Sequence, residues 1–446
     1  MPHTDDDIAQ MLATVGAASV DELIDQIPAG LRPARFNLPA GVTELELTRH
    51  MRELAERNRH AGQVDVYRGA GLYDHAVPAA VHALGSRGEF ATAYTPYQPE
   101  ASQGTLQAIY EFQTIVCELT GMEVANASLY DGASAFAEAA LVALRVTGRQ
   151  RLLVSRAVHP EYRDVLHTYL AGTADEIVPA PALSGASDVE AVTQAMNDSI
   201  AAVMVQMPNV FGCLEPVQQL AEIAHAHGAL FIVAVPEPVS LGLLEAPGRY
   251  GADIVVGEGQ TLGNAVSYGG PSLGFFATRE PWMRKIPGRI CGRTKDLAGR
   301  TGYVLTLQAR EQHIRREKAT SNICTNEGLL ALRTTIFLSL LGPQGLRELA
   351  LLNFHHAHYL QQELLKLPHF RQKFQQPFFN EFVLELRDRR QEAVLERALD
   401  AAGIVGGLPL GGIDETLGGC WLWCVTETKT KAQLDKVCDV LRGTRG

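Results

Sequence analysis

The chain has 446 residues, of which 46% are hydrophobic and 20% charged, as is ordinary for a soluble globular protein with a substantial core. Its formal net charge of −11 argues against non-specific binding to nucleic acid or to an anionic membrane. The acidic N-terminus lacks the apolar segment of a secretory signal, no apolar run is long enough to span a membrane, and the seven cysteines show no C-x-x-C motif, so we expect a cytoplasmic protein with reduced thiols.

Residues 1–55 are predicted to form a helical arm. Thr4 precedes three aspartates, as expected at a helix start, and Ser19 with Glu22 has the spacing of a capping box. An arm of this length is too short to bury a core of its own. It therefore packs either on the body of its own chain or around a partner subunit, and the sequence leaves both possibilities open.

Residues 86–105 form a long stretch without helix or strand periodicity. Loops of this length in compact domains are usually functional or disordered, and the tyrosines here argue against disorder. A loop that merely covers the core is the simpler interpretation, but we favour a binding loop. Its hydrogen-bonding side chains include Tyr94, Thr95, Tyr97, Gln98 and Gln103.

Two helices are predicted to follow. The first has apolar residues at helical spacing over 106–119 and ends at Gly121, and the second runs from Ala133 to about Val146. The turn at Asp131 and Gly132 precedes the second helix. A glycine turn that leads into a helix N-terminus binds phosphate or carboxylate readily, although many helix starts bind nothing.

From residue 151 onward, short apolar segments alternate with helical ones. RLLVS, AAVMVQM and ALFIVAV are strand-like, and helices are expected around 160–171, 188–196 and 216–227. This alternation predicts a parallel sheet with crossover helices, an α/β fold in which ligands bind beyond the carboxyl ends of the strands. The segments 208–212 and 236–238 would lie at that edge.

The segment GADIVVGEGQTLGNAVSYGGPSLGFFAT, residues 251–278, predicts two buried strands joined by a glycine-rich loop at the same edge. Dinucleotide binding is disfavoured because Leu262 stands where the third glycine of G-x-G-x-x-G belongs. GPSLG matches the G-x-S-x-G of a nucleophile elbow, but a proline precedes this serine and a strand-like segment follows it. The third possibility is a loop that carries a lysine bonded to pyridoxal phosphate.

The positions of the lysines show whether this loop could bond pyridoxal phosphate. The first lysine of the chain is Lys285, so this loop has none. Schiff-base chemistry needs a side-chain amine, and this chain alone therefore cannot bond the cofactor here. If the loop descends from a lysine-bearing one, Gln260 is the vacated position.

Positive charge is concentrated near residue 315. Arg310, His313, Arg315, Arg316 and Lys318 fall within nine residues of an acidic protein, followed by the polar segment 320–322. A solvated helix face would explain such a run. We favour a site-lining role, because clustered guanidinium groups are suited to holding carboxylates or an acidic partner.

The division predicted from these patterns is an arm at 1–55, a large domain at 56–330, and a linking helix with a small C-terminal α+β domain at 331–446. In the last part FNEFVLEL and CWLWCVTE are strand-like, and Cys420 and Cys424 share one strand face as core residues.

Two pairs of closely spaced histidines could in principle bind a metal. His225 and His227 lie two residues apart on a helix and face different sides, whereas His355 and His358 lack a Cys, Asp or Glu partner at ligand spacing. We interpret both pairs as surface or packing residues and expect no metal.

Four segments together carry a resemblance to a known family: TAYTPYQPEASQGTLQ, LTGMEVANASLYDGASA, GADIVVGEGQTLGNAVSYGGP and REQHIRREKATSNICT. They resemble glycine dehydrogenase (decarboxylating), the P-protein of the glycine cleavage system, over nearly the whole chain. The chain looks like the first of the two subunits into which some bacteria split P-protein. In that arrangement only the second subunit carries the lysine, which matches its absence here. The resemblance implies the fold type I architecture of pyridoxal-phosphate-dependent transferases.

The resemblance also implies partners. A second P-protein subunit would carry the lysine and the pyridoxal phosphate, and the complex would decarboxylate glycine and pass the aminomethyl group to the lipoyl arm of H-protein. This chain would be inactive alone, and a dimer of heterodimers is expected. It would lend residues to the partner's active site, the candidates being Tyr94, Thr95, Tyr97, Gln98, Gln103, Arg310, His313 and Arg315.

Rival functions stay open at this stage. The chain could be a self-sufficient pyridoxal enzyme that uses a lysine elsewhere, such as Lys318, or a purely structural subunit that lends no catalytic group. The hydrolase suggested by GPSLG is the third rival.

Overall fold

The structure is a computed structural model that describes residues 3–32, 37–91 and 94–444. Two compact units are present, Met1–His60 and Ala61–Gly446. The limits of the large and small domains within the second unit, as predicted from the sequence, stay a prediction.

The described residues of the first unit form helices α1 (Asp5–Val15), α2 (Val20–Ile24) and α3 (Glu44–Ala55). Thr4 and Thr43 cap α1 and α3 in capping boxes, and Ser19 caps α2 by accepting a hydrogen bond from the backbone of Glu22. The helix starts predicted at Thr4 and Ser19 are therefore confirmed. None of the residues in these three helices is buried.

The second unit is built on a seven-stranded sheet with the strand order β2-β8-β7-β6-β5-β3-β4. Strands β3 to β7 are parallel, whereas β8 is antiparallel to both of its neighbours. The parallel sheet expected from the alternating pattern is confirmed. The strands are β2 (Val124–Ala125), β3 (Arg151–Ser155), β4 (Glu176–Ala180), β5 (Ile200–Gln206), β6 (Leu230–Val235), β7 (Ile254–Glu258) and β8 (Gly274–Thr278).

Helices cover both faces of this sheet. Alternate residues of the central strands pack into two separate clusters, with Val203 and Phe231 in one and Met204 and Ile232 in the other. Because both faces are buried, the central strands are apolar on both faces, with polar residues only at their ends, instead of alternating apolar and polar residues. The covering helices are α5 (Gln103–Thr120), α8 (Val189–Ala195) and α9 (Val217–Ala226) on the first cluster, and α6 (Gly132–Thr147) and α7 (Pro160–Leu170) on the second.

Strand β4 was not predicted from the sequence. Its sequence, EIVPA, contains Pro179, and four of its five residues are exposed or only partly buried. The strand lies at the edge of the sheet, where a proline costs no ladder hydrogen bond and where little apolar surface needs to be covered. Strand β4 therefore lacks the continuous apolar run that identifies the central strands in the sequence.

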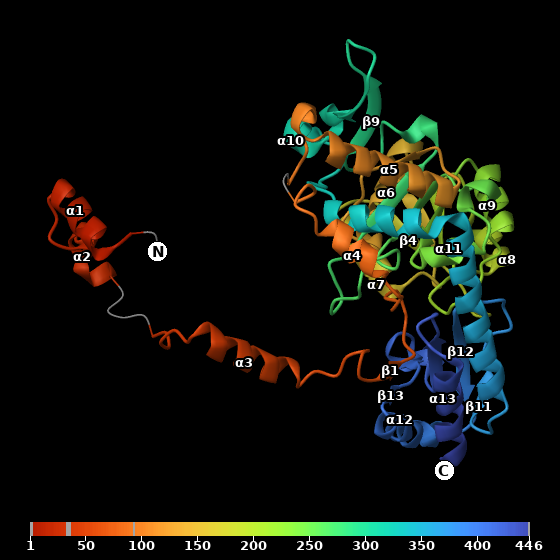
Figure 1. Ribbon diagram of the computed structural model, residues 1–446. Helices are drawn as coiled ribbons and strands as arrows, with labels where there is room; N and C mark the ends of the chain where they lie inside the picture. Colours follow the sequence, from red (N-terminus) through yellow and green to blue (C-terminus); the bar gives the residue numbers. More distant parts are fainter. Residues whose placement is uncertain (1–2, 33–36, 92–93, 445–446) are drawn as a thin grey trace. The chain divides into compact units, whose positions relative to one another are not determined.

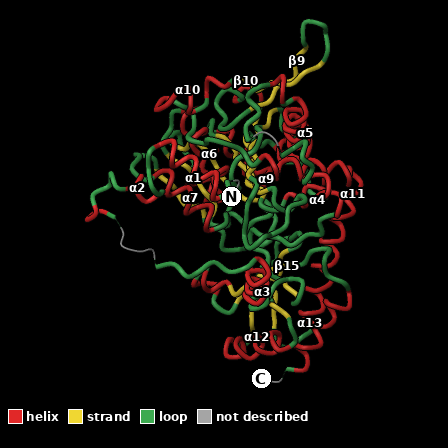
Figure 2. The backbone as a smooth tube through the Cα atoms, turned by 60° about the vertical axis from the view of Figure 1, so that its left-hand side comes forward, coloured by secondary structure: helices red, strands yellow, loops and turns green. Residues whose placement is uncertain are grey.

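A two-stranded antiparallel hairpin was also not predicted. It consists of β9 (Ile290–Lys295) and β10 (Thr301–Thr306). Figures 1 and 2 both show it projecting from the body of the second unit, next to α5. Leu297, in its turn, is fully exposed.

Helix α11 (Gly328–Leu365) joins the large sheet to the C-terminal part (Figure 1). Gly342 has non-helical backbone angles (φ 62°, ψ −179°) and precedes Pro343, so two helical segments meet there at a kink. By length and composition alone α11 could cross a membrane, but both halves carry buried residues and the helix contacts α5, α4 (Ala79–Gly85) and α13 (Lys431–Gly443). It is a core helix of this unit.

The C-terminal part contains an antiparallel sheet of order β11-β12-β15-β14. Cys420 and Cys424 lie in β15 and are both buried, as predicted. Tyr67, which follows the short strand β1 (Asp65–Val66), packs into the same core. The other elements are β11 (Phe370–Gln372), β12 (Glu381–Leu386), α12 (Glu392–Ala401), β13 (Ile404–Val405), β14 (Leu408–Pro409) and β15 (Cys420–Cys424).

Candidate functional site

The glycine-rich loop begins at the carboxyl end of β7, as predicted, and runs to β8. Its residues 259–273 contain no helix, which excludes the dinucleotide-binding arrangement of strand, glycine turn and helix. Ser272 is followed by β8, so a nucleophile elbow is absent as well. Both alternative functions for this loop are therefore wrong.

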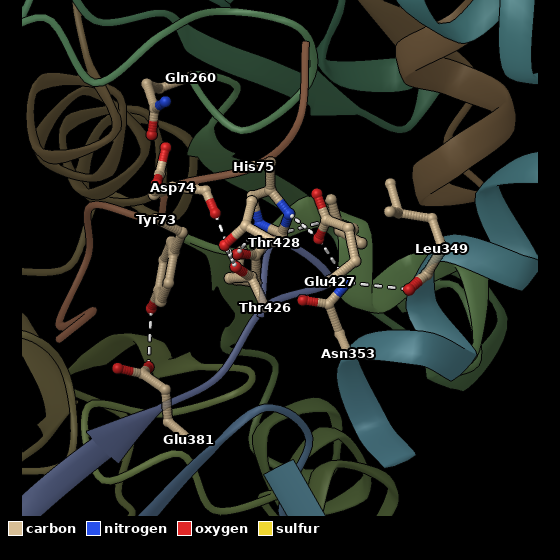
Figure 3. A network of polar contacts seen from close by, with 12 residues as sticks. Tyr73, Asp74, His75, Gln260, Leu349, Asn353, Glu381, Thr426, Glu427 and Thr428 are labelled. Carbon is tan, nitrogen blue, oxygen red and sulfur yellow. Dashed lines mark hydrogen bonds and ion pairs between the residues drawn. The ribbon is translucent and has the colours of Figure 1, made fainter. Parts of the chain in front are cut away.

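Gln260, the predicted position of the missing lysine, is buried just beyond β7. Its side-chain Nε2 donates a hydrogen bond of 2.6 Å to the backbone oxygen of Asn264, and its backbone nitrogen donates one of 3.0 Å to Glu258. Within the described residues, its Oε1 atom has no hydrogen-bond partner. Figure 3 shows this side chain pointing toward the segment that carries Tyr73 and Asp74.

Glu258, the last residue of β7, makes the contacts that a bound anion would make. Its carboxylate accepts hydrogen bonds from the backbone nitrogens of Gly132 (3.1 Å), Gln260 (3.0 Å) and Leu273 (2.7 Å). Burial raises the pKa of Glu258 to about 7, although the three backbone donors act in the opposite direction. Gly132 begins α6, so the helix start that the sequence indicated as a phosphate or carboxylate site holds a carboxylate of this chain.

Pyridoxal phosphate does not fit these residues. The amine that would bond it is absent at Gln260, and Glu258 occupies the helix start that would receive its phosphate group. A side chain's β-carbon placed on Gly132 would lie only 2.0 Å from the hydroxyl oxygen of Tyr162, so the space is also filled.

A buried polar network lies below Gln260 in Figure 3 and is centred on His75. Its Nε2 lies 2.9 Å from a carboxylate oxygen of Glu237, which follows β6, and its Nδ1 lies 2.8 Å from one of Glu427, which follows β15. Asn353 of α11 donates a hydrogen bond of 3.0 Å to Glu427. Burial alone would lower the pKa of His75, but the two carboxylates outweigh it and raise the pKa to about 10.

A second buried carboxyl group lies beside this network. Tyr73 donates a hydrogen bond of 2.8 Å to Glu381 of β12, and the backbone nitrogen of Ala70 donates another of 2.7 Å. Burial raises the pKa of Glu381 to about 7. The segment 70–76 thus bonds to groups that follow β6 and to groups on β12 and after β15, which fixes the small C-terminal sheet to the large one.

The loop residues Tyr94, Thr95 and Gln98 lie at or near the surface. Tyr94 is 87% exposed and lines a hollow of about 280 Å³ between the loop, α5 and the start of α11. Thr95 is half-buried and Gln98 is exposed. The hollow is lined by Phe90, Tyr94, Pro96, Thr105, Ala108, Ile109, Asn326, Glu327, Gly328, Leu329, Ala331 and Leu332.

Tyr97 and His313, predicted from separate parts of the sequence, lie together. Their ring centroids are 6.0 Å apart in an edge-on arrangement. Arg289 joins them, because its Nη2 lies 3.3 Å from the Tyr97 hydroxyl and its guanidinium carbon lies 5.6 Å from the centre of that ring. The carboxylate of Glu311 lies 3.7 Å from both Arg289 and His313.

Sequence reasoning missed two residues of this group, Glu311 and the more extensively bonded Arg289. Its guanidinium is buried and also donates to Thr325 (3.0 Å), Asn326 (3.1 Å) and the backbone oxygen of Cys324 (3.0 Å). The signal in the sequence was an arginine that lies outside the charge run at 310–318, directly before the apolar start of a strand, where a charge needs partners.

The other predicted candidates do not join this group. Gln103 bonds the backbone of Tyr303 in the hairpin. Arg310 directs its guanidinium to the backbone oxygens of Ile286, Leu307 and Gly288, so its donors are committed within the chain. Arg315 is exposed. Their proposed role in a partner's active site stays a prediction.

The class of protein follows from this architecture. A C-DES variant with glycine covalently linked to its PLP cofactor shares the fold at 14% sequence identity, with a TM-score of 0.63 over 87% of this chain and 100% of that one. The sphingosine-1-phosphate lyase of Burkholderia pseudomallei shares it at 16% identity and a TM-score of 0.66, over 93% of both chains. The chain has the fold of the pyridoxal-phosphate-dependent enzymes of fold type I.

The family is more specific. The family model described as glycine cleavage system P-protein matches residues 1–441, and the chain therefore belongs to that family. It is 52% identical over 438 residues to the probable glycine dehydrogenase (decarboxylating) subunit 1 of Desulfitobacterium hafniense, with 98% of each chain covered. The corresponding subunit 1 of Moorella thermoacetica is 50% identical over 444 residues, with 99% of each covered.

A solved structure agrees with this assignment. The crystal structure of glycine decarboxylase (P-protein) of the glycine cleavage system, in inhibitor-bound form, is similar with a TM-score of 0.90 and 44% identity, over 100% of this chain and 99% of that chain. The family and the fold class expected from the sequence are confirmed.

Proposed function

We propose that this chain is the subunit of a two-subunit glycine decarboxylase that does not bond the cofactor. One observation carries the proposal: the chain has the complete fold of a pyridoxal-phosphate enzyme, but Gln260 stands at the end of β7 and no lysine precedes Lys285. The name subunit 1 of the relatives supports the existence of a second subunit. That second subunit would carry the lysine and the cofactor.

The complex would act on glycine and deliver the aminomethyl group to the lipoyl arm of H-protein. The cofactor in the second subunit supplies an electron sink for the loss of carbon dioxide. This chain would complete the walls of that active site. We propose a dimer of heterodimers located in the cytoplasm, in line with the bacterial relatives.

The loop 94–103 is the part of this chain best placed to reach a partner. Tyr94 is almost fully exposed, and Tyr97 is about half exposed while its hydroxyl is held by the buried Arg289. A side chain that is exposed yet anchored from behind is suited to present one fixed group across an interface. His313, next to Tyr97, would belong to the same contributed group.

The arm is a second candidate contact with the partner. Its helices carry several apolar side chains that are exposed, among them Met11, Leu23 and Leu47. Apolar surface of this kind is stabilised when another protein covers it. We propose that the arm wraps around the second subunit.

The self-sufficient enzyme is the less favoured alternative. Lys318 is exposed in a short turn, Arg316–Lys318. A lysine that forms Schiff bases is activated by desolvation or by a neighbouring cation in a pocket. The surface position of Lys318 is unsuited to that role.

Purification of the chain alone gives the deciding experiment. We expect no visible absorbance from a lysine-bound cofactor after incubation with pyridoxal phosphate and no release of carbon dioxide from glycine, followed by activity when the second subunit is added. A peptide of this chain carrying the cofactor after borohydride reduction would overturn the proposal.

A further inference from the structure

We propose that the carboxyl group of Glu258 permanently takes the place of a cofactor phosphate at the start of α6, so that the fold is complete without any ligand there. This inference concerns the chain by itself and does not depend on the proposed role in a complex.

Three of the first four backbone N–H groups of α6 already have acceptors within the chain. The backbone nitrogen of Gly132 donates to Glu258, and that of Ser134 donates to the Asp131 carboxylate at 2.7 Å. The next nitrogen, of Ala135, donates to the backbone oxygen of Asp131 at 3.0 Å. Anion binding at a helix N-terminus depends on free N–H groups of this first turn. Three of the four groups that would bind a phosphate are therefore occupied, two by side chains and one by the helix itself.

The surroundings of Gly132 are also tightly packed. The buried hydroxyl of Tyr162 lies over Gly132, and a β-carbon added there would also come within 3.2 Å of the Glu258 β-carbon. From the other side, a β-carbon on Gly274 would lie 2.3 Å from the backbone oxygen of Asp131, so β8 presses closely on the same turn. Neither glycine therefore leaves space for a side chain at this turn.

Charge gives the third argument. Asp131 and Glu258 place two carboxyl groups at one helix start, and their mutual repulsion contributes to the raised pKa of Glu258. The positive end of the helix dipole corresponds to only about half an elementary charge, so it offsets little negative charge in the first turn. A phosphate dianion would add further negative charge to a site that the chain has already compensated.

A consequence is that the stability of this subunit is independent of the cofactor. In a protein that uses a ligand to complete its fold, bound ligand raises the melting temperature by mass action. Here the carboxyl group that fills the site is covalently attached to the chain and always present. Neither pyridoxal phosphate nor inorganic phosphate should therefore stabilise the wild-type chain beyond the effect of equal ionic strength.

The test is chemical rescue. Glu258→Ala removes the Cγ atom and the carboxylate, a group of the size of acetate, and leaves three backbone donors facing the gap. We expect a melting temperature several degrees below wild type that acetate raises in a concentration-dependent manner, relative to chloride at equal ionic strength. Wild type and Val256→Ala, a buried substitution on the same strand that leaves an apolar gap, should show no such response.

Two results would overturn the inference. One is a folded Glu258→Ala protein that acetate does not stabilise, and the other is wild-type protein that inorganic phosphate or pyridoxal phosphate stabilises specifically. If Glu258→Ala does not fold, Glu258→Gln replaces it: its amide fills the space, so it should be destabilised by the loss of one acceptor and should not respond to acetate. An acetate response of the glutamine variant would contradict the inference too. All readouts are melting temperatures, so a negative result leaves the proposed function untouched.

Discussion

The side-chain amide of Gln103 pairs with both backbone polar groups of Tyr303. Its Oε1 accepts a hydrogen bond of 2.8 Å from the Tyr303 nitrogen, and its Nε2 donates one of 2.9 Å to the Tyr303 oxygen. Gln113 forms the same pair of bonds with Cys291, at 2.8 and 2.9 Å. Since Tyr303 lies in β10 and Cys291 in β9, helix α5 holds both strands of the projecting hairpin by glutamine side chains.

The two glutamines should differ in their contribution. Gln113→Ala leaves a buried backbone N–H and C=O unpaired, which costs about 1–3 kcal/mol, whereas Gln103 is exposed and water can replace it in Gln103→Ala. We expect faster amide hydrogen exchange over 290–306 in both variants, with the larger increase in Gln113→Ala. Equal exchange in the wild type and in both variants would show that the hairpin is held by other contacts.

Tyr97 should affect the complex more than this chain. Tyr97→Phe removes the hydroxyl held by Arg289 and leaves the exposed ring in place, so folding and assembly should be unchanged. If the loop contributes to the partner's active site, turnover of glycine by the reconstituted complex falls on the order of tenfold, or about 1.4 kcal/mol of transition-state stabilisation. Tyr94→Phe is the parallel variant in the same loop. Unchanged turnover in both, with normal assembly, would favour a purely structural subunit.

His75 should make stability depend on pH in the alkaline range. The pKa of His75 is raised from 6.5 to about 10 in the folded protein, so its contribution is fully present below pH 6.5 and is lost as the pH rises toward 10. His75→Gln leaves Glu237 and Glu427 buried without a cation, which costs about 3–5 kcal/mol below pH 6.5. Denaturant unfolding of both proteins across this range measures the difference. A wild-type advantage that stays constant up to pH 10 would contradict the charged state of His75.

Restoring the lysine alone should fail. In Gln260→Lys the amine returns, but Glu258 still occupies the start of α6, so we expect no visible absorbance from a bonded cofactor after incubation with pyridoxal phosphate. Glu258→Gly combined with Gln260→Lys frees the three backbone donors, and more cofactor should be trapped by borohydride reduction. Gln260→Met, which keeps the length without an amine, is the matched control. Stoichiometric labelling of the single lysine variant would show that Glu258 does not block the site.

Local patterns were sufficient for most of the large sheet. The apolar runs of β5, β6 and β7 and the helix start at Asp131 depend on neighbours in the sequence, and the structure has them where the patterns place them. The edge strand β4 escaped because Pro179 and its half-exposed surface remove the apolar signal. The hairpin escaped because glutamines of α5, distant in sequence, hold its strands.

The contacts between buried polar groups could not be predicted, because their partners are distant in the sequence. His75 and Glu427 are 352 residues apart in the chain, and no local pattern relates them. Arg289 meets Tyr97 across 192 residues. Glu258 does carry a signal in the sequence: a carboxyl group at the end of the apolar run IVV is expected to be buried and hydrogen-bonded, and a helix start is a natural source of donors.

The carboxylate at the start of α6 also bears on how the division of labour could be undone in evolution. If a lysine returned at position 260 first, Glu258 would still occupy the start of α6. If Glu258 were lost first, a buried cavity would form and no amine would be present to bond the cofactor. Neither change alone would therefore restore cofactor binding in this chain. The need for two changes at once would keep the subunit dependent on a partner subunit for catalysis.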